Sequence, residues 1–154
     1  MQYFTSYMSL ALEEAKKAAD KEEFPVGAVV ISPDNEVISQ AHNRTRELDD
    51  PTAHAEILAL RAAANKLGNE RLVGCNLYVT LEPCTMCAGA ISHARIKRLY
   101  YALEDEKGGA ISNGVRFLDH KNCLYKTEYY YGFEAEKSKK IIDDFIGRLR
   151  VDSF

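Results

Sequence analysis

Two short segments constrain the fold of this chain more than any other part of its sequence: residues 54–56 (His-Ala-Glu) and residues 83–87 (Pro-Cys-Thr-Met-Cys). Two cysteines separated by two residues can place both sulfur atoms on one metal ion at the start of a helix, and a histidine can add a nitrogen ligand. Residues 55–82 have the length of one helix, one turn and one strand. We therefore expect the chain to return on itself, so that both segments meet at the N-terminal ends of two helices.

The predicted ligands are His54, Cys84 and Cys87, and they suit one Zn²⁺ per chain. Three protein ligands leave the fourth tetrahedral position open, which is typical of a catalytic zinc site. The positive N-terminal ends of helices lower thiol pKa values and so favour thiolate ligands. Glu56 is predicted to carry protons rather than to bind the metal. Because side chains two residues apart on a helix diverge, Glu56 can reach the site only if the metal lies close to the helix end.

A Cys-x-x-Cys pair also occurs in redox proteins and in closed structural zinc sites. A redox role is poorly supported, because the strand before Pro83 has no other thioredoxin-like feature. A closed zinc site needs a fourth protein ligand, and the candidates lack paired-ligand spacing: Cys75, Cys123, His42, His93 and His120. The additional His-x-Glu segment therefore favours a catalytic zinc.

The length and composition indicate one globular domain over residues 1–154, with 46% hydrophobic and 28% charged residues. A net charge of −3 gives no overall attraction to nucleic acid, so any RNA contact must use local positive charge. We expect no membrane span and no signal peptide, because the apolar N-terminal residues lack a basic leader and are followed by Glu13 and Glu14. The cysteines are then expected to be reduced thiols in the cytoplasm, with Cys75 and Cys123 simply buried.

Hydrophobic periodicity and turn residues predict alternating helices and strands. Helices are predicted over residues 3–21, 51–67, 83–94 and 134–150, and strands over residues 26–31, 37–41, 77–81, 96–101 and 124–131. The first two strands are expected to form a hairpin, and residues 102–123 to be irregular. Asp50 is the expected N-cap of the second helix, with Pro51 at its first position. This order predicts an α/β fold with a central mixed sheet and helices on its faces.

The pattern His-x-Glu…Pro-Cys-x-x-Cys is the known signature of zinc-dependent nucleobase deaminases. Residues 25–29 (Pro-Val-Gly-Ala-Val), 50–57 (Asp-Pro-Thr-Ala-His-Ala-Glu-Ile) and 77–90 resemble in particular the bacterial tRNA-specific adenosine deaminases, within the cytidine deaminase-like superfamily. The resemblance spans nearly the whole chain. It implies a three-layer fold with a five-stranded sheet, a homodimer, and conversion of adenosine to inosine at the wobble position of a tRNA anticodon stem-loop.

The resemblance also implies four substrate-binding residues. Asn43 would hydrogen-bond the base, and Asp105 would lie near the ribose edge of the substrate. Phe145 and Arg150, in the last predicted helix, match residues that lie near the RNA in the family. The chain departs from the family in two places, because residues 146–147 (Ile-Gly) lack a second aromatic and a basic residue, and Glu104 stands where the family often has a basic or neutral residue. Both departures concern RNA contacts rather than the deamination chemistry.

Three functions are compatible with these motifs. The leading one is deamination of tRNA, which the residues Thr80-Leu81-Glu82 favour by resemblance. A free nucleobase or nucleoside deaminase, such as a guanine deaminase, would use the same zinc chemistry on a small substrate. A structural or nucleic-acid-binding zinc protein would have no use for the proton carrier Glu56. Two basic clusters could meet RNA phosphates, although solvated surfaces would look the same: Arg95, Lys97 and Arg98 in one, and Lys137, Lys139, Lys140, Arg148 and Arg150 in the other.

Overall fold

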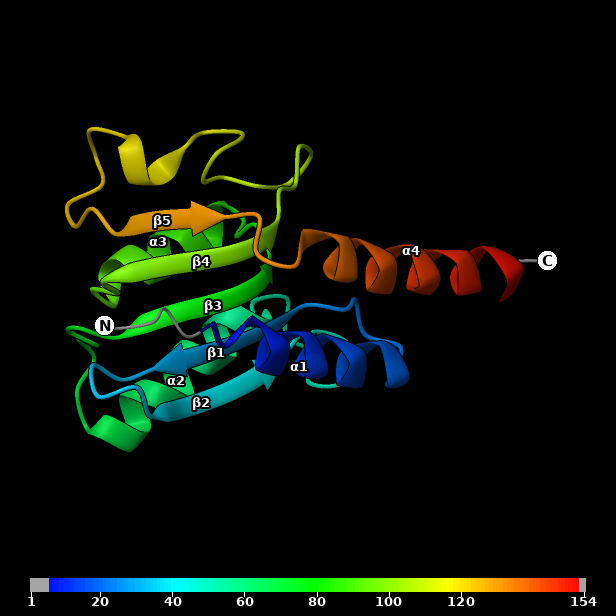
Figure 1. The fold of residues 1–154 in the computed structure, drawn as a ribbon, viewed down its shortest axis with the longest axis horizontal. Coiled ribbons are helices and arrows are strands. Elements are labelled where there is room, and N and C mark those ends of the chain that lie inside the picture. The colour runs from blue at the N-terminus through cyan, green and yellow to red at the C-terminus, as the bar shows by residue number, and fades with distance from the viewer. Residues whose placement is uncertain (1–5, 153–154) are drawn as a thin grey trace.

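The computed structural model describes residues 6–152 and places a mixed sheet between two layers of helices (Figure 1). The helices are α1 (Met8–Asp20), α2 (Ala55–Leu67), α3 (Thr85–His93) and α4 (Ala135–Asp152), with a short 3₁₀ helix η1 (Phe117–Asp119). The strands are β1 (Gly27–Ile31), β2 (Val37–His42), β3 (Asn76–Leu81), β4 (Arg98–Leu103) and β5 (Glu128–Tyr131). The α/β class, the three layers and the five-stranded mixed sheet are therefore confirmed.

The sheet has the strand order β2-β1-β3-β4-β5. Strand β1 pairs antiparallel with β2, which confirms the predicted hairpin, and it also pairs antiparallel with β3. Strands β3, β4 and β5 are parallel to one another. A parallel connection needs a crossover, and α3 supplies the one between β3 and β4. Helix α3 therefore begins where β3 ends, which brings the residues after β3 to one edge of the sheet.

Both faces of the central strands are buried, and each face has its own core. Ala28 and Val30 of β1 pack with α2 and α3, whereas the alternate residues Val29 and Ile31 pack with Met8 and Leu12 of α1. This period of two is the pattern of a strand covered on both sides. Ile141 of α4 packs against the second core. Helices α2 and α3 thus cover one face of the sheet, and α1 and α4 cover the other (Figure 1).

The contact between α1 and the sheet is close enough to require glycine at the start of β1. A Cβ atom at Gly27 would lie 2.7 Å from the Ala15 backbone nitrogen and 2.8 Å from the Glu14 Cβ, and it would also run into the Ala11 carbonyl oxygen. The Gly27 N–H donates to Thr80 Oγ1 at 3.1 Å, which ties β1 to β3 near the end that leads to the cysteines.

Several predicted boundaries are wrong. The first helix begins at Met8, and the prediction for residues 3–5 lies outside the described residues. The fourth strand runs from 98 to 103 rather than from 96 to 101, because residues 96 and 97 still connect α3 to the sheet through the bonds from Ile96 N to Ile91 O and from Lys97 N to Cys75 O. The irregular segment 102–123 contains the end of β4 and the helix η1.

The last strand is shorter than predicted, because residues 124–127 belong to the preceding loop. The Thr127 hydroxyl donates to the Ile96 carbonyl at 2.7 Å, and Lys126 Nζ donates to the carbonyls of Leu118 and His120. Leu124 is 89% exposed, so its apolar side chain contributes nothing to a strand in the core. The hydrophobic pattern alone did not distinguish this loop from a strand.

Asp50 is not the N-cap of α2. The helix begins at Ala55, and His54 occupies the N-cap position with an extended backbone. Asp50 Oδ1 instead accepts bonds from the backbone N–H and the hydroxyl of Thr52, which closes a local turn before the helix. None of the helices within residues 6–152 combines the length and the apolar surface needed to span a bilayer.

Candidate active site and metal centre

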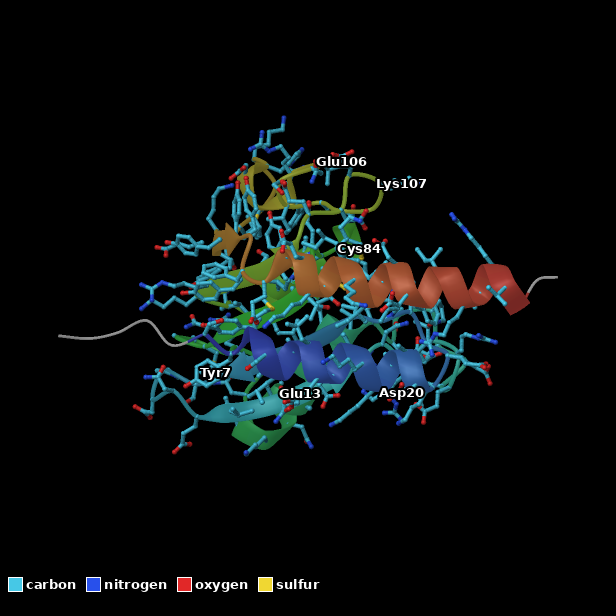
Figure 2. The ribbon with its side chains drawn as sticks, turned by 45° about the vertical axis from the view of Figure 1, so that its right-hand side comes forward. Tyr7, Glu13, Asp20, Cys84, Glu106 and Lys107 are labelled. Carbon is cyan, nitrogen blue, oxygen red and sulfur yellow. The ribbon has the colours of Figure 1, made fainter. Side chains whose placement is uncertain are left out.

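His54 and Cys84 occupy equivalent positions, because each is the N-cap of a helix on the same face of the sheet. His54 precedes α2, and Cys84 precedes α3, both with extended backbone angles. Cys87 lies in the first turn of α3. In the view of Figure 2, Cys84 lies between α4 and the loop that carries Glu106 and Lys107. The return path predicted for residues 55–82 is therefore confirmed, and it brings two helix starts together.

The three predicted ligands lie at the distances that a zinc site requires. His54 Nδ1 is 3.6 Å from Cys84 Sγ and 3.4 Å from Cys87 Sγ, and all three donor atoms lie within 4.8 Å of one another. Zinc bond lengths of about 2.3 Å to sulfur and about 2.1 Å to nitrogen, at a tetrahedral angle, place a sulfur and a nitrogen ligand about 3.6 Å apart. The donor set and its spacing thus fit a zinc ion.

The residues that could close the site with a fourth ligand lie elsewhere. Within residues 6–152, the three ligands form the one group of histidine, cysteine or carboxylate side chains suited to hold a metal. Cys75 and Cys123 are buried free thiols, as predicted. His42 Nδ1 lies 2.9 Å from Glu14 Oε2, and His120 Nδ1 accepts the Asn122 N–H. The open coordination position expected of a catalytic zinc is consistent with this arrangement.

The electrostatics of the site favour a metal cation. The hydrogen bond from Cys87 and, to a smaller extent, the one from His54 lower the pKa of Cys84 to about 4, so its sulfur is a thiolate. The hydrogen bond to Cys84 raises the pKa of Cys87, as does burial. The hydrogen bond with Cys84 raises the pKa of His54. Because zinc ligands must be deprotonated, metal binding releases the protons that this cluster holds.

Glu56 lies in the first turn of α2 and is 4% exposed. Because His54 precedes the helix in an extended conformation, the divergence expected of two residues on a regular helix does not apply to this pair. The Glu56 carboxyl instead reaches Cys87 through a hydrogen bond. Burial raises the pKa of Glu56, and the nearby Cys84 thiolate raises it further. A carboxyl group with a raised pKa beside a metal site can both accept and donate a proton near neutral pH.

A cavity of about 310 Å³ opens onto the ligands. Its size falls within the range of about 300–1,000 Å³ that is usual for small-molecule pockets. The lining residues come from five segments of the chain: Phe24, Val26, Asn43, Thr45, His54, Ala55, Glu56, Leu81, Glu82, Cys84, Asp105 and Gly108. The structure thus brings Asn43 and Asp105 to the same cavity as Glu56 and two of the metal ligands.

Asn43 directly follows β2 and is 8% exposed. Its backbone N–H donates to the Val26 carbonyl at 3.1 Å, which fixes the residue beside the start of β1. Asp105 follows β4 and accepts bonds from the backbone N–H groups of Lys107 and Gly108 with one carboxylate oxygen. The Asp105 carboxylate is therefore held by the backbone around it, and the backbone of Asn43 is fixed beside β1.

The two predicted residues of α4 lie differently with respect to the cavity. Phe145 is 6% exposed and packs edge-to-face on Phe24, with ring centroids 5.9 Å apart. Phe24 in turn lines the cavity. Arg150 is exposed on the part of α4 that projects beyond the sheet (Figure 1). Phe145 therefore lies behind the cavity wall, and Arg150 lies on the outer surface.

Phe24 and Glu82 are lining residues for which the sequence predicted no role in the site. Glu82 is 3% exposed, and although burial opposes ionisation, hydrogen bonds from Asp105, Asn113 and Ile111 lower its pKa. In the sequence, Glu82 was noted only as part of the segment Thr80-Leu81-Glu82, through the family resemblance. Phe24 carried no signal, because an aromatic residue before Pro25 is expected to be core.

Comparison with known proteins agrees with this site. A family model described as the cytidine and deoxycytidylate deaminase zinc-binding region matches residues 1–103. The tRNA-specific adenosine deaminase of Agrobacterium fabrum is 51% identical over 148 residues, covering 96% of this chain and 97% of that protein. A solved structure from work on A-to-I editing by tRNA:A34 deaminases at the wobble position has a TM-score of 0.86 and 53% identity, covering 88% of this chain and 97% of that one.

A guanine deaminase of Bacillus subtilis is also similar, but over less of the chain. Its solved structure has a TM-score of 0.62 and 37% identity, and the match covers 67% of this chain and 66% of that one.

The metal ligands can be tested by substitution. Cys84→Ser and Cys87→Ser should each lose bound zinc, because a serine hydroxyl is a poor replacement for a thiolate on zinc. Cys123→Ser, which changes a buried thiol outside the ligand group, should keep about one zinc per chain. Atomic emission measured together with protein concentration gives the zinc content. Full zinc occupancy in either ligand variant would contradict the assignment.

Proposed function

This chain belongs to the tRNA-specific adenosine deaminases, within the larger family of zinc-dependent cytidine and deoxycytidylate deaminases, and we propose that it converts adenosine to inosine at the wobble position of a tRNA anticodon. The observation that carries the proposal is the single cavity that joins the proton carrier Glu56, the zinc-binding group and Asn43. We propose that residues 1–154 form one deaminase domain. The two hydrophobic cores lie on opposite faces of the same sheet, which supports the assignment of a single domain.

The zinc site is assigned to His54, Cys84 and Cys87. When bound, zinc supplies Lewis acidity that makes water a nucleophile near neutral pH. Water adds at C6 of adenine, and ammonia leaves, so the products are inosine and ammonia. Glu56 accepts one proton from the attacking water and delivers it to the ring nitrogen, and it then takes the proton of the new C6 hydroxyl and gives it to the leaving amine. The burial that raises the pKa of Glu56 suits it to hold this proton between the steps.

The base must leave its stack to reach Glu56, because the cavity admits a base and not a duplex. We assign the Asn43 amide to hydrogen bonds with the flipped base, and Asp105 to the ribose edge. Arg150 is assigned to the RNA outside the cavity, and Phe145, which is buried, is assigned to support the cavity wall that the RNA meets. The edge-to-face contact of Phe145 with Phe24 supports this assignment, since it connects α4 to the cavity wall.

A free nucleobase or nucleoside deaminase, such as a guanine deaminase, is the second candidate. The 37% identity to the Bacillus subtilis guanine deaminase over two thirds of the chain favours it. The wobble deaminase is preferred, because the identity to tRNA-specific relatives is higher and extends over 148 residues. The two candidate functions share the zinc chemistry. They differ in the substrate, because only a tRNA extends beyond the cavity and contacts the surface around it.

We further propose that the protein is a cytoplasmic homodimer. Membership of the deaminase family supports the dimer. All four cysteines are free, which suits a reducing compartment, and a tRNA substrate is met in the cytoplasm.

The dimer can be tested by light scattering coupled to size exclusion. We expect twice the chain mass at micromolar concentration, in both low and moderate salt. A monomer mass under these conditions would contradict this part of the proposal.

The role of Glu56 predicts a separation of zinc binding from turnover. Glu56→Ala should keep its zinc and its melting temperature but lose about 10²–10⁴-fold or more in kcat, since a placed general base contributes that much. Glu13→Ala is the matched control, because Glu13 is an exposed carboxylate on α1 (Figure 2). Inosine formation measured by mass spectrometry gives the rate. Substantial turnover by Glu56→Ala would mean that another group moves the proton.

The choice of substrate gives the sharpest test of function. An anticodon stem-loop with adenosine at the wobble position should be deaminated, whereas free adenine, adenosine and guanine should not. Activity should fall with added salt, because phosphate contacts release counterions. Efficient turnover of guanine without turnover of the stem-loop would establish the second candidate instead.

Arg150→Ala should weaken stem-loop binding and leave the zinc content unchanged. Arg71→Ala is its matched control, because Arg71 is an exposed arginine before β3, at the opposite end of that strand from Cys84. Fluorescence anisotropy with a labelled stem-loop measures both affinities. Equal affinities of the two variants for the stem-loop would show that Arg150 does not contribute to RNA binding.

A further inference from the structure

Glu82 is a buried carboxylate that the deamination mechanism does not use. It lies between the last residue of β3 and the Pro83-Cys84 segment, and it is 3% exposed. Its own N–H donates to the Leu103 carbonyl at 2.8 Å, which ties it to the end of β4. A buried charge is costly unless it is hydrogen-bonded, so the partners of this side chain indicate its role.

All the side-chain partners of Glu82 come from the loop that follows β4, residues 104–113. Glu82 Oε1 accepts bonds from the backbone N–H of Asp105, the Asn113 side-chain amide and the Ser112 hydroxyl at 3.0, 2.7 and 3.2 Å. Glu82 Oε2 accepts the backbone N–H groups of Ile111, Ser112 and Asn113 at 3.0, 3.1 and 3.0 Å. A carboxylate has about four lone-pair sites. The loop therefore occupies the whole acceptor capacity of Glu82, which leaves none for substrate or for proton transfer.

The loop is folded tightly around this carboxylate. The Gly109 N–H donates to the Asp105 carbonyl, and the Ala110 N–H donates to the Pro83 carbonyl, both at 2.9 Å. A Cβ atom at Gly109 would run into the Glu82 carboxyl group, so only glycine fits there. The loop turns outward at Glu106 and Lys107, which lie at its tip (Figure 2).

The same loop forms one wall of the cavity through Asp105 and Gly108. Glu82 holds the loop at both ends, at residue 105 and at residues 111–113. The position of the Asp105 carboxylate relative to the zinc ligands is therefore set by a residue two positions before Cys84.

We propose that Glu82 is a positioning residue for substrate binding, which fixes the 104–113 loop so that Asp105 meets the nucleotide. The substrate named here rests on the proposed function; the link between Glu82 and the loop does not. Because Glu82 acts through the loop and not on the reacting atoms, its loss should affect KM and leave kcat nearly unchanged.

Glu82→Gln tests the proposal with little change of shape. A glutamine has one accepting oxygen, and its NH₂ group would face N–H donors of the loop. We expect faster hydrogen exchange at the amides of residues 105 and 111–113. We also expect KM for the stem-loop to rise about tenfold, the usual scale for buried donors left without a charged acceptor. The zinc content and kcat should stay within about twofold of the wild type, since zinc ligands and Glu56 are untouched.

Glu106→Gln is the matched control. Glu106 is an exposed carboxylate at the tip of the same loop (Figure 2). Its substitution should leave both exchange and KM near the wild-type values. An equal effect of the two substitutions would overturn the special role of Glu82.

A double variant separates positioning from general stability. If Glu82 acts through Asp105, then Glu82→Gln should add little to KM in an Asp105→Asn background, because neighbouring residues in one network are not additive. Fully additive effects would overturn the proposal, as would a fall in kcat at unchanged KM. If Glu82→Gln does not fold, Gly109→Ala tests the same contact from the loop side, with the same expected split between KM and kcat.

Hydrogen exchange keeps the two proposals distinguishable. Unchanged exchange in residues 105–113 of Glu82→Gln would overturn the positioning role, whatever the substrate. Faster exchange together with turnover of guanine in place of the stem-loop would support the positioning role and reject the proposed function.

Discussion

The convergence of two helix N-termini on one point is the constraint on which the rest of this structure depends. His54 Nδ1 lies within 3.6 Å of both cysteine sulfurs, although 30 residues separate it from Cys84. That distance requires β3 to lie beside β1 and α3 to pack next to α2 on the same face of the sheet. The positions at which α2 and α3 begin are fixed by the β1–β2 hairpin, by the parallel strands and by the two cores.

The cavity is built from loops that the same sheet brings to one edge. Asn43 follows β2, Glu82 follows β3, and Asp105 follows β4. Backbone N–H groups hold the carboxylates of Glu82 and Asp105, so these two side chains are placed before any substrate arrives. Such preorganisation reduces the ordering that binding must supply. Zinc binding, proton transfer and base recognition are therefore assigned to different residues, and all of these residues lie at one edge of the sheet.

The sequence predicted the parts of the site that local chemistry determines. Cysteine spacing and the His-x-Glu pattern identified a metal group with the right geometry, and periodicity identified the α-helices and strands of residues 6–152 but not the short helix η1. The resemblance, rather than the pattern, pointed to Asn43 and Asp105. The role of Glu82 was not predictable, because its partners lie 23 to 31 residues away in an irregular loop. The cap of α2 was mispredicted because Asp50 forms a local turn with Thr52 that competes with capping.

Zinc K-edge absorption spectroscopy of the wild-type protein tests the central claim most directly, because it reports the atoms around the metal. The account predicts two sulfur atoms at about 2.3 Å and two nitrogen or oxygen atoms at about 2.0–2.1 Å, of which only one belongs to an imidazole. A third sulfur or a second imidazole would show a closed site with four protein ligands. That result would contradict a catalytic zinc and the deaminase mechanism built on it.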